Sequence, residues 1–430
     1  MTRLLVLALL LSGWAASLQA AESCVECHER ETPAAVAQWR SSAHAQAVGC
    51  ADCHGNDHDA IVAGNAVVDT KICGRCHQEA YHQHVASRHG MGLHSGWGCT
   101  RAMDKRDPRE CRFCHEEGST RPKSTVHCAR FLMQSSEMGE IGCNRCHQVE
   151  SSCASCHTNH LTDLEPLRRS EICATCHMGP DHPQWEMWQT SRHGILNGIS
   201  GAAVGPSCQR CHMPGGSHDV SFGITMTSGM ELLPAEVRTK RRGEMLGVCK
   251  ECHAQGFSTR ELARDDAVRT QSVALVERAA ETIRRLDDRN LLQPAPQQRP
   301  AHPLAGPKLV LDNQMLYENL SRAERLFFKM KKYDLAKAVK GAYHQNPAYT
   351  HWYGNAELKL TLAEIEAEAA LLEQVAGRSP MVGGQATGGA TSQEQRLQEL
   401  KRSFERGALS AADYAAEKAR VLDAVRAASP

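Results

Sequence analysis

The feature that most constrains this chain is a five-residue pattern, Cys-x-x-Cys-His, which occurs nine times and ends for the last time at His253. The chain has 430 residues and 20 cysteines, of which only Cys99 and Cys128 stand outside the pattern. Two thiols and an imidazole at this spacing are the attachment signature of c-type haem. A redox or zinc site is the alternative for one motif, but nine copies favour a multihaem cytochrome.

Each motif predicts two cysteines joined to one haem and one histidine bound to its iron. The predicted haem-binding cysteines are Cys24, Cys27, Cys50, Cys53, Cys73, Cys76, Cys111, Cys114, Cys143, Cys146, Cys153, Cys156, Cys173, Cys176, Cys208, Cys211, Cys249 and Cys252. The predicted proximal ligands are His28, His54, His77, His115, His147, His157, His177, His212 and His253.

The composition indicates what fills the core. Aromatic residues are only 5% of the chain, few for a chain that must build a large core from side chains. Porphyrin would take their place. We therefore expect a mainly α fold, with short helices and loops wrapped around a haem-packed core and long helices after it. The motif intervals are irregular and indicate no repeat of fixed period.

The N-terminus reads as a secretory signal, with basic Arg3, an apolar run and a small-residue cleavage zone at Ala20 or Ala21. The run is too short to favour a membrane anchor, so we expect a periplasmic protein. The predicted organisation is a signal peptide over 1–21, a multihaem domain over 22–260, a helical domain over 261–376, a flexible linker over 377–392 and a helical hairpin over 393–430.

Hydrophobic periodicity predicts three long helices in the helical domain. The first covers residues 261–290 and the second residues 312–344. Asn346-Pro347 breaks the second helix, and Asn355 is a candidate cap for the third, which runs to about Val375.

Histidine is abundant, at 23 residues. A haem that only transfers electrons needs two strong axial ligands, whereas a catalytic haem needs one open position. The fourteen histidines outside the motifs can supply most second ligands. His182 differs because it adjoins Asp181, and a carboxylate beside an imidazole can hold and pass protons. The alternative is that His182 is a distal ligand and Asp181 a turn residue.

The order of the motifs resembles the hydroxylamine oxidoreductase family of octahaem cytochromes. The resemblance rests on the close pair Cys143–His147 and Cys153–His160 and on Met178-Gly179-Pro180-Asp181-His182, which follows the motif Cys173–His177 directly. Separately, the pattern from Leu397 to Leu422 resembles the small helical-hairpin module called SHOCT, an oligomerisation or docking appendage.

The resemblance implies roles for particular residues. The haem on Cys143, Cys146 and His147 would be the active one, with an open position, and Asp181 and His182 its catalytic pair. Homotrimers are implied. In the oxidative members of the family a tyrosine is cross-linked to the active haem of a neighbouring subunit, and Tyr349 is the candidate here; the alternative is that Tyr349 only packs. The implied distal ligands are His44, His58, His127, His160, His193, His218 and His344.

One segment departs from the family pattern. Cys99 to Cys128 is an insertion that holds the extra motif Cys111–His115. Two interpretations are open. In the first, the segment carries a ninth haem on Cys111, Cys114 and His115, with Cys99 and Cys128 joined by a disulfide. In the second, some of these five residues hold a different metal or pair with each other. We therefore expect eight or nine covalently bound haem c groups.

The leading functional hypothesis is a redox enzyme acting on a small nitrogen oxide, by hydroxylamine oxidation or by nitrite or hydroxylamine reduction, with a slight preference for reduction. Its electron partner would be an electron-transfer cytochrome or a quinone-linked membrane cytochrome. The formal net charge of zero gives no indication of nucleic-acid binding. The alternatives are a non-enzymatic electron-transfer cytochrome and, less favoured, a sulfur-oxyanion reductase, which would use Cys-x-x-Cys-Lys; the sequence has no such motif.

Overall fold

The computed structural model describes residues 24–91, 149–179, 182–295, 320–377 and 409–427, together with 298, 309, 311, 397, 400, 401, 403 and 404. Several predicted features lie outside these residues: the signal peptide, the motifs Cys111–His115 and Cys143–His147, and Asp181, His127, Cys99 and Cys128.

The mainly α prediction is confirmed. Within the described residues, β-structure is limited to one isolated antiparallel bridge between Met226 and Leu232. No described helix is long and apolar enough to cross a membrane. Residues up to Glu373 form one compact unit, and Gln374–Pro430 form a second.

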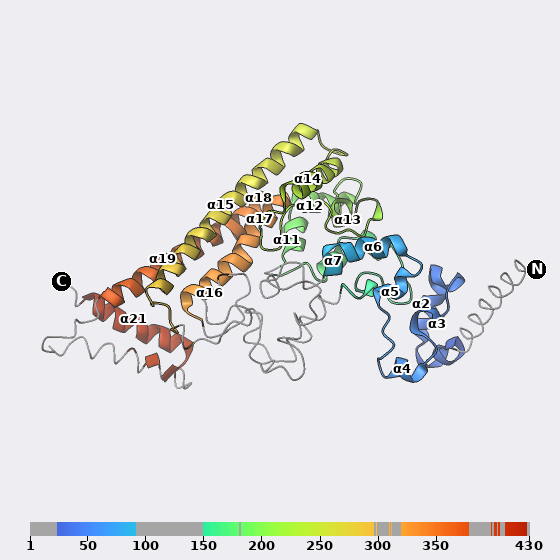
Figure 1. Cartoon of the computed structure of the whole chain (residues 1–430), viewed down its shortest axis with the longest axis horizontal. Helices are drawn as coiled ribbons and strands as arrows, with labels where there is room; N and C mark the ends of the chain where they lie inside the picture. Colours follow the sequence, from blue (N-terminus) through green and yellow to red (C-terminus); the bar gives the residue numbers. More distant parts are fainter. Residues whose placement is uncertain are drawn as a thin grey trace, which may run out of the picture. The chain divides into compact units, whose positions relative to one another are not determined.

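The part of the first unit that carries the motifs consists of short helices joined by loops (Figure 1). These are α2 (Pro33–Ser41), η1 (Ala43–Gln46), α3 (Cys50–His54), α4 (His58–Val62), α5 (Thr70–Gly74), α6 (Gln78–Ala86), α7 (Arg88–Met91), η5 (Cys153–Ser155), η6 (Pro166–Arg168), α10 (Glu171–Ala174), α11 (Gln184–Gln189), α12 (Arg192–Ser200), α13 (Cys208–His212) and η7 (Pro214–Gly216).

Helices and helical turns, several of them longer, follow. They are α14 (Ala235–Cys249), α15 (Gln255–Asp288), α16 (Arg322–Lys329), the π-helical turn η9 (Met330–Asp334), α17 (Leu335–Tyr343), α18 (Pro347–Tyr349), the π-helical turn η10 (Thr350–Asn355) and α19 (Ala356–Gly377). Helix α15 packs against α14, α16 and α17. It also runs through residue 260, so one helix joins the motif-bearing region to the helical region.

The apolar core belongs to these longer helices. Ile283 and Leu286 of α15, Val339 of α17, and Leu358 and Ile365 of α19 are all fully buried. Among the described residues before Met226, buried apolar side chains are few: Val25, Val36 and Met187. The motif-bearing region therefore lacks an aliphatic core of its own, as expected where porphyrin fills the interior.

The predicted break at Asn346-Pro347 is present, but the third helix begins earlier than predicted. The Asn346 side chain accepts a hydrogen bond from the Tyr349 amide at 2.9 Å, and Pro347 occupies the first helical position, where its missing N–H costs nothing. Asn346, not Asn355, is the cap, and Asn355 lies inside the π-turn η10 that leads into α19. The second predicted helix is divided by the π-turn η9.

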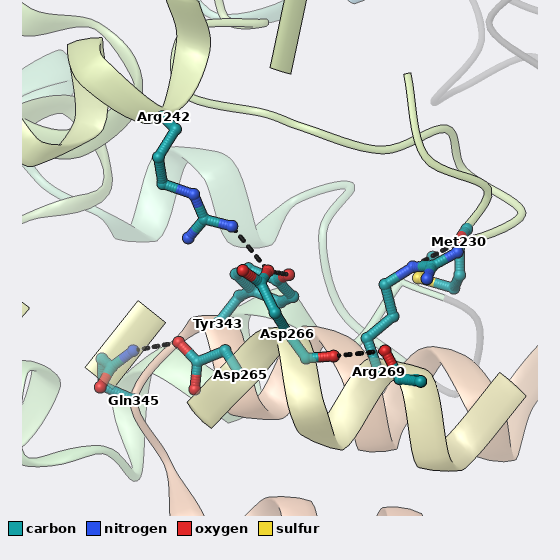
Figure 2. Close-up of polar contacts among 8 residues, drawn as sticks. Met230, Arg242, Asp265, Asp266, Arg269, Tyr343 and Gln345 are labelled. Atoms are coloured by element: carbon teal, nitrogen blue, oxygen red, sulfur yellow. Dashed lines mark hydrogen bonds and ion pairs between the residues drawn. The ribbon is translucent and has the colours of Figure 1, made fainter. Parts of the chain in front are cut away.

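A polar network joins α14, α15 and the end of α17 (Figure 2). Arg242 of α14 donates to Asp266 of α15 at 2.6 Å, and the Tyr343 hydroxyl donates to the same carboxylate. Gln345 donates to Asp265 at 2.6 Å. These contacts hold the residues on both sides of His344, which is the C-cap of α17.

In the second unit, α21 spans Ala411–Ala427. It begins with a side-chain cap: the Asp413 amide donates to the Ser410 hydroxyl at 3.1 Å, and that hydroxyl donates to the Asp413 carboxylate at 2.6 Å. Phe404 stacks on Tyr414 with ring centroids 4.7 Å apart.

The contact between η10 and α17 leaves no room for a side chain at Gly354. A Cβ there would lie 2.3 Å from the Cα of Ala338, which is backbone that cannot move aside alone. We expect Gly354→Ala to destabilise the protein by about 1–3 kcal/mol. Gly243→Ala is the control, because a Cβ at that helical position meets no atom within 4 Å, and it should be neutral or stabilising by about 0.5–1 kcal/mol. Equal denaturation midpoints for the two variants would contradict this packing.

The buried Asp265 carboxyl makes the free energy of unfolding depend on pH. It is 7% exposed, and burial, with the neighbouring charge of Asp266, raises its pKa from 3.8 to about 7. The folded state therefore holds a proton between these values that the unfolded state has released, so stability falls as pH rises through this window, by up to about 1.4 kcal/mol per pH unit. Asp265→Asn keeps an acceptor for Gln345 and cannot ionise. Its free energy of unfolding relative to the wild type should therefore rise from pH 4 to pH 8, and a constant difference would contradict the assignment.

Candidate functional site

Each described motif folds into a single helical turn. The amide of the motif histidine donates to the carbonyl of the first cysteine at 2.9 Å in the motifs that end at His77, His157, His177 and His253. Residues three and four positions apart share a helix face. One turn therefore presents two thiols and an imidazole together, which is the arrangement needed to fix a porphyrin by its edge and its iron.

Every described motif histidine lies beside a second histidine from another segment. The ring centroids are 5.9–6.4 Å apart in seven pairs: His28–His58, His77–His44, His54–His160, His177–His89, His157–His218, His253–His193 and His212–His344.

This separation fits an iron atom between two imidazoles. With metal–nitrogen bonds of about 2 Å, two imidazoles on opposite sides of one metal have ring centroids about 6 Å apart. It is too long for direct hydrogen bonding between the rings. Six of the seven non-motif partners are distal ligands implied by the sequence: His44, His58, His160, His193, His218 and His344. The seventh implied distal ligand, His127, lies outside the described residues.

Hydrogen bonds orient several of these rings. The Nδ1 atom of His344 donates to the Lys340 carbonyl at 2.7 Å. The Nδ1 atom of His44 lies 3.1 Å from the Thr162 hydroxyl, and that of His28 lies 2.8 Å from the Thr32 hydroxyl. With Nδ1 occupied, Nε2 remains for a metal, as is usual for a histidine ligand.

Burial keeps the rings neutral, which ligation of a metal requires. It lowers the pKa of His177 to about 3, with added repulsion from His89 and His182. Burial likewise lowers the pKa of His89 to about 4 and that of His344 to about 4. The pKa of His212 and that of His193 are also lowered, mainly by burial.

His89 is the partner that the sequence reasoning missed. The signal was present, because Ser87-Arg88-His89-Gly90 repeats Ser191-Arg192-His193-Gly194 letter for letter. In both copies the serine hydroxyl donates at 2.7 Å to the carbonyl three residues earlier, in His84 and Trp188. Ser42, before His44, makes the same bond to Trp39 at 2.7 Å.

The glycines of this repeated element are needed for close packing. A Cβ on Gly90 would lie 2.3 Å from the His84 carbonyl oxygen, and one on Gly194 would lie 2.0 Å from that of Trp188. The buried serine ends one helix, and the glycine lets the next begin directly against it. The histidine between them is held at a fixed point in the chain.

Hydrogen bonds and an ion pair connect several of the described motifs to one another. The Arg75 guanidinium donates to the Asp52 carbonyl at 2.8 Å, and the Thr70 amide donates to the Ser151 carbonyl at 3.0 Å. These bonds connect the motifs at Cys50, Cys73 and Cys153. The Ser170 hydroxyl accepts from the Cys208 amide at 3.1 Å, and an ion pair between Arg210 and Glu251 connects that motif to the last one.

His182 lies near the His177–His89 pair. Its ring centroid is 6.3 Å from that of His177, almost the distance of His89 from the same ring. Its proposed partner Asp181 lies outside the described residues. Distance alone therefore leaves two candidates for the position opposite His177.

Tyr349 is buried by other residues of the same chain. It is 9% exposed and its ring lies 4.9 Å from that of Tyr353. Burial, with the charge of Glu186, raises its pKa to about 12. The exposed aromatic residues of this segment are Trp352, at 68%, and Tyr353, at 58%.

Comparison with known proteins agrees with this geometry. The chain is 26% identical over 467 residues to a probable nitrite reductase–hydroxylamine oxidoreductase fusion protein of Kuenenia stuttgartiensis, covering 82% of this chain and 52% of that protein. It therefore spans about half the length of this relative.

Two solved structures share the fold. A reducing hydroxylamine-oxidoreductase-like protein complex of Kuenenia stuttgartiensis matches with a TM-score of 0.65 at 22% identity, covering 84% of this chain and 86% of that chain. A hypothetical multiheme protein matches with a TM-score of 0.61 at 14% identity, covering 83% and 96%.

The family described as "Seven times multi-haem cytochrome CxxCH" matches residues 45–300, more than half of the chain. Its defining motif is the one that the structure folds into single helical turns beside paired imidazoles. The chain belongs to this multihaem cytochrome family and resembles hydroxylamine-oxidoreductase-like proteins in fold, which implies covalently bound haem c.

Proposed function

We propose that this protein is a periplasmic oxidoreductase that reduces small nitrogen oxides, such as nitrite or hydroxylamine, at a haem on Cys143, Cys146 and His147. The observation that carries the proposal is the set of seven histidine pairs. It provides two ligands for every described motif. Of the two motifs outside the described residues, the family resemblance favours the one at Cys143 as the candidate for an open iron. Export through the signal peptide would place haem attachment outside the cytoplasm.

The seven pairs would supply the electron-transfer part of the protein. Two imidazoles keep iron low-spin and limit its rearrangement on reduction. The bonds between motifs connect six of these seven centres in two groups: those at Cys50, Cys73 and Cys153, and those at Cys173, Cys208 and Cys249. Such groups suit a chain that stores several electrons and delivers them to one site without releasing reactive intermediates.

The chain's own contribution to the chemistry is proton supply. An open haem provides electrons and a position for the substrate. His182 and the adjacent Asp181 would bring the protons that accompany each electron. His182 is suited to this because an imidazole can both hold and release a proton near neutral pH. For that role it must be free of iron, so we assign His89 as the ligand opposite His177.

The reductive direction is supported by two observations. One structural relative is described as a reducing hydroxylamine-oxidoreductase-like complex. In addition, Tyr349 is buried against Tyr353, whereas a residue that reaches a neighbouring subunit must lie on the surface of its own chain. This supports a packing role for Tyr349. If the protein forms the homotrimer that the family resemblance implies, the exposed Trp352 and Tyr353 are the aromatic residues available at that contact.

A non-enzymatic electron carrier is the second candidate. It would require a second axial ligand for the haem at Cys143 as well. The same paired imidazoles favour this function for the described motifs, so only the spin state of that haem separates the two proposals.

The two histidines near His177 give a direct test. We expect His89→Ala to convert one low-spin haem to high-spin, because it removes an axial ligand, with the haem-to-protein ratio unchanged. His182→Ala should add no high-spin signal. Electron paramagnetic resonance of the oxidised proteins measures both. If His182→Ala produces the new high-spin signal and His89→Ala does not, the ligand assignment is reversed.

Turnover tests the proton role. We expect Asp181→Asn and His182→Gln each to lower nitrite or hydroxylamine reduction by about 10²–10⁴-fold, the usual contribution of a positioned proton donor. Haem content and the low-spin spectrum should stay as in the wild type. Tyr349→Phe is the matched control and should retain turnover, since its ring packs without reaching substrate. Wild-type rates in the Asp181 and His182 variants would contradict the mechanism.

A further inference from the structure

We propose that Arg88 and Arg241 form an anion site that binds the propionate carboxylates of the haem on Cys208, Cys211 and His212. The inference rests on the proposed ligation of that haem by His212 and His344. It assigns a function to two arginines that the proton and electron chemistry does not use.

The two guanidinium groups converge on one short segment. The Arg88 amide donates to the Ser221 hydroxyl at 2.8 Å, and its guanidinium donates to the Met226 carbonyl. Arg241, from α14, donates to the Ser221 carbonyl. Ser221 is 6% exposed, so two cations from distant parts of the chain meet at a buried backbone segment.

No acidic side chain compensates these charges within the part of the chain that the structure describes. The adjacent Arg242 shows the contrast, since it pairs with Asp266 at 2.6 Å. Two neighbouring guanidiniums with only carbonyl partners are unfavourable unless an anion joins them.

The site lies next to a haem ligand. Helix α13, which carries Cys208, Cys211 and His212, packs against α14, which carries Arg241. His212 is one of the imidazoles of the His212–His344 pair. A haem held there carries two propionates, and the planar donor fork of arginine matches a carboxylate in a bidentate manner. The anion that the arginines lack and the carboxylates that the haem brings are therefore complementary.

The arrangement predicts an effect on the redox equilibrium of this haem. Reduction adds one negative charge, which nearby cations stabilise. Removal of one arginine should favour the oxidised form. Arg241 is the residue to change, because Arg88 directly precedes His89 and its replacement could disturb that ligand.

The experiment is a potentiometric titration of the holoprotein, comparing Arg241→Gln with Lys240→Gln. Lys240 is the neighbouring residue with an 80% exposed side chain, so its variant removes the same charge from the solvent face. We expect Arg241→Gln to shift one one-electron component about tenfold toward the oxidised form, or about 59 mV, and Lys240→Gln to shift none. Equal curves for the two variants would overturn the proposal.

Two further arms keep the test decisive. If Arg241→Gln loses haem, Arg241→Lys is the second variant, because it retains the charge but not the planar donor fork. The propionate bending bands in its resonance Raman spectrum should differ from those of the wild type. Unchanged bands would overturn the proposal. A small soluble anion in place of propionate would make the potential depend on the buffer anion, so a difference between chloride and phosphate would also overturn it. The haem content and low-spin spectrum of the unchanged protein test the proposed ligation separately.

Discussion

The structure depends on pairs of imidazoles held about 6 Å apart by different segments of the chain. In each described pair, one histidine is fixed by its own Cys-x-x-Cys-His turn, and the other arrives from an unrelated loop or helix end. The motif-bearing region has few buried apolar side chains, with Met187 and Val36 among them. Metal coordination and porphyrin contact must therefore supply most of the cohesion there, whereas α15, α17 and α19 form a conventional apolar core.

The second imidazole of each pair is positioned by elements with separate local causes. At His44, His89 and His193 a buried serine closes the preceding helix and fixes where the next turn begins. His344 is positioned differently. The Lys340 carbonyl orients its ring. The residues on either side are held by hydrogen bonds, Gln345 to Asp265 and Tyr343 to Asp266. The haem sites thus depend on the long helices as well as on the motifs, since α15 carries the anchoring carboxylates for a ligand in α17.

The sequence predicted the helical class, the motif turns and the helix break at Asn346-Pro347, because these features follow from local chemistry. It did not pair any histidine with its partner, because the partners come together only through long-range folding. His89 was missed, although its Ser-Arg-His-Gly context repeats that of His193. The start of the third helix was misplaced at Asn355, since a π-turn that packs Gly354 against Ala338 has no periodic signature.

In the proposed mechanism, electron transfer, for which paired imidazoles are suited, is separate from chemistry at a single open iron. The most direct test of that separation is a quantitative electron paramagnetic resonance spectrum of the fully oxidised holoprotein. We expect low-spin signals from the paired haems together with one high-spin component that changes when nitrite or cyanide is added. A spectrum that is wholly low-spin and insensitive to both ligands would contradict it, and would identify the protein as an electron carrier.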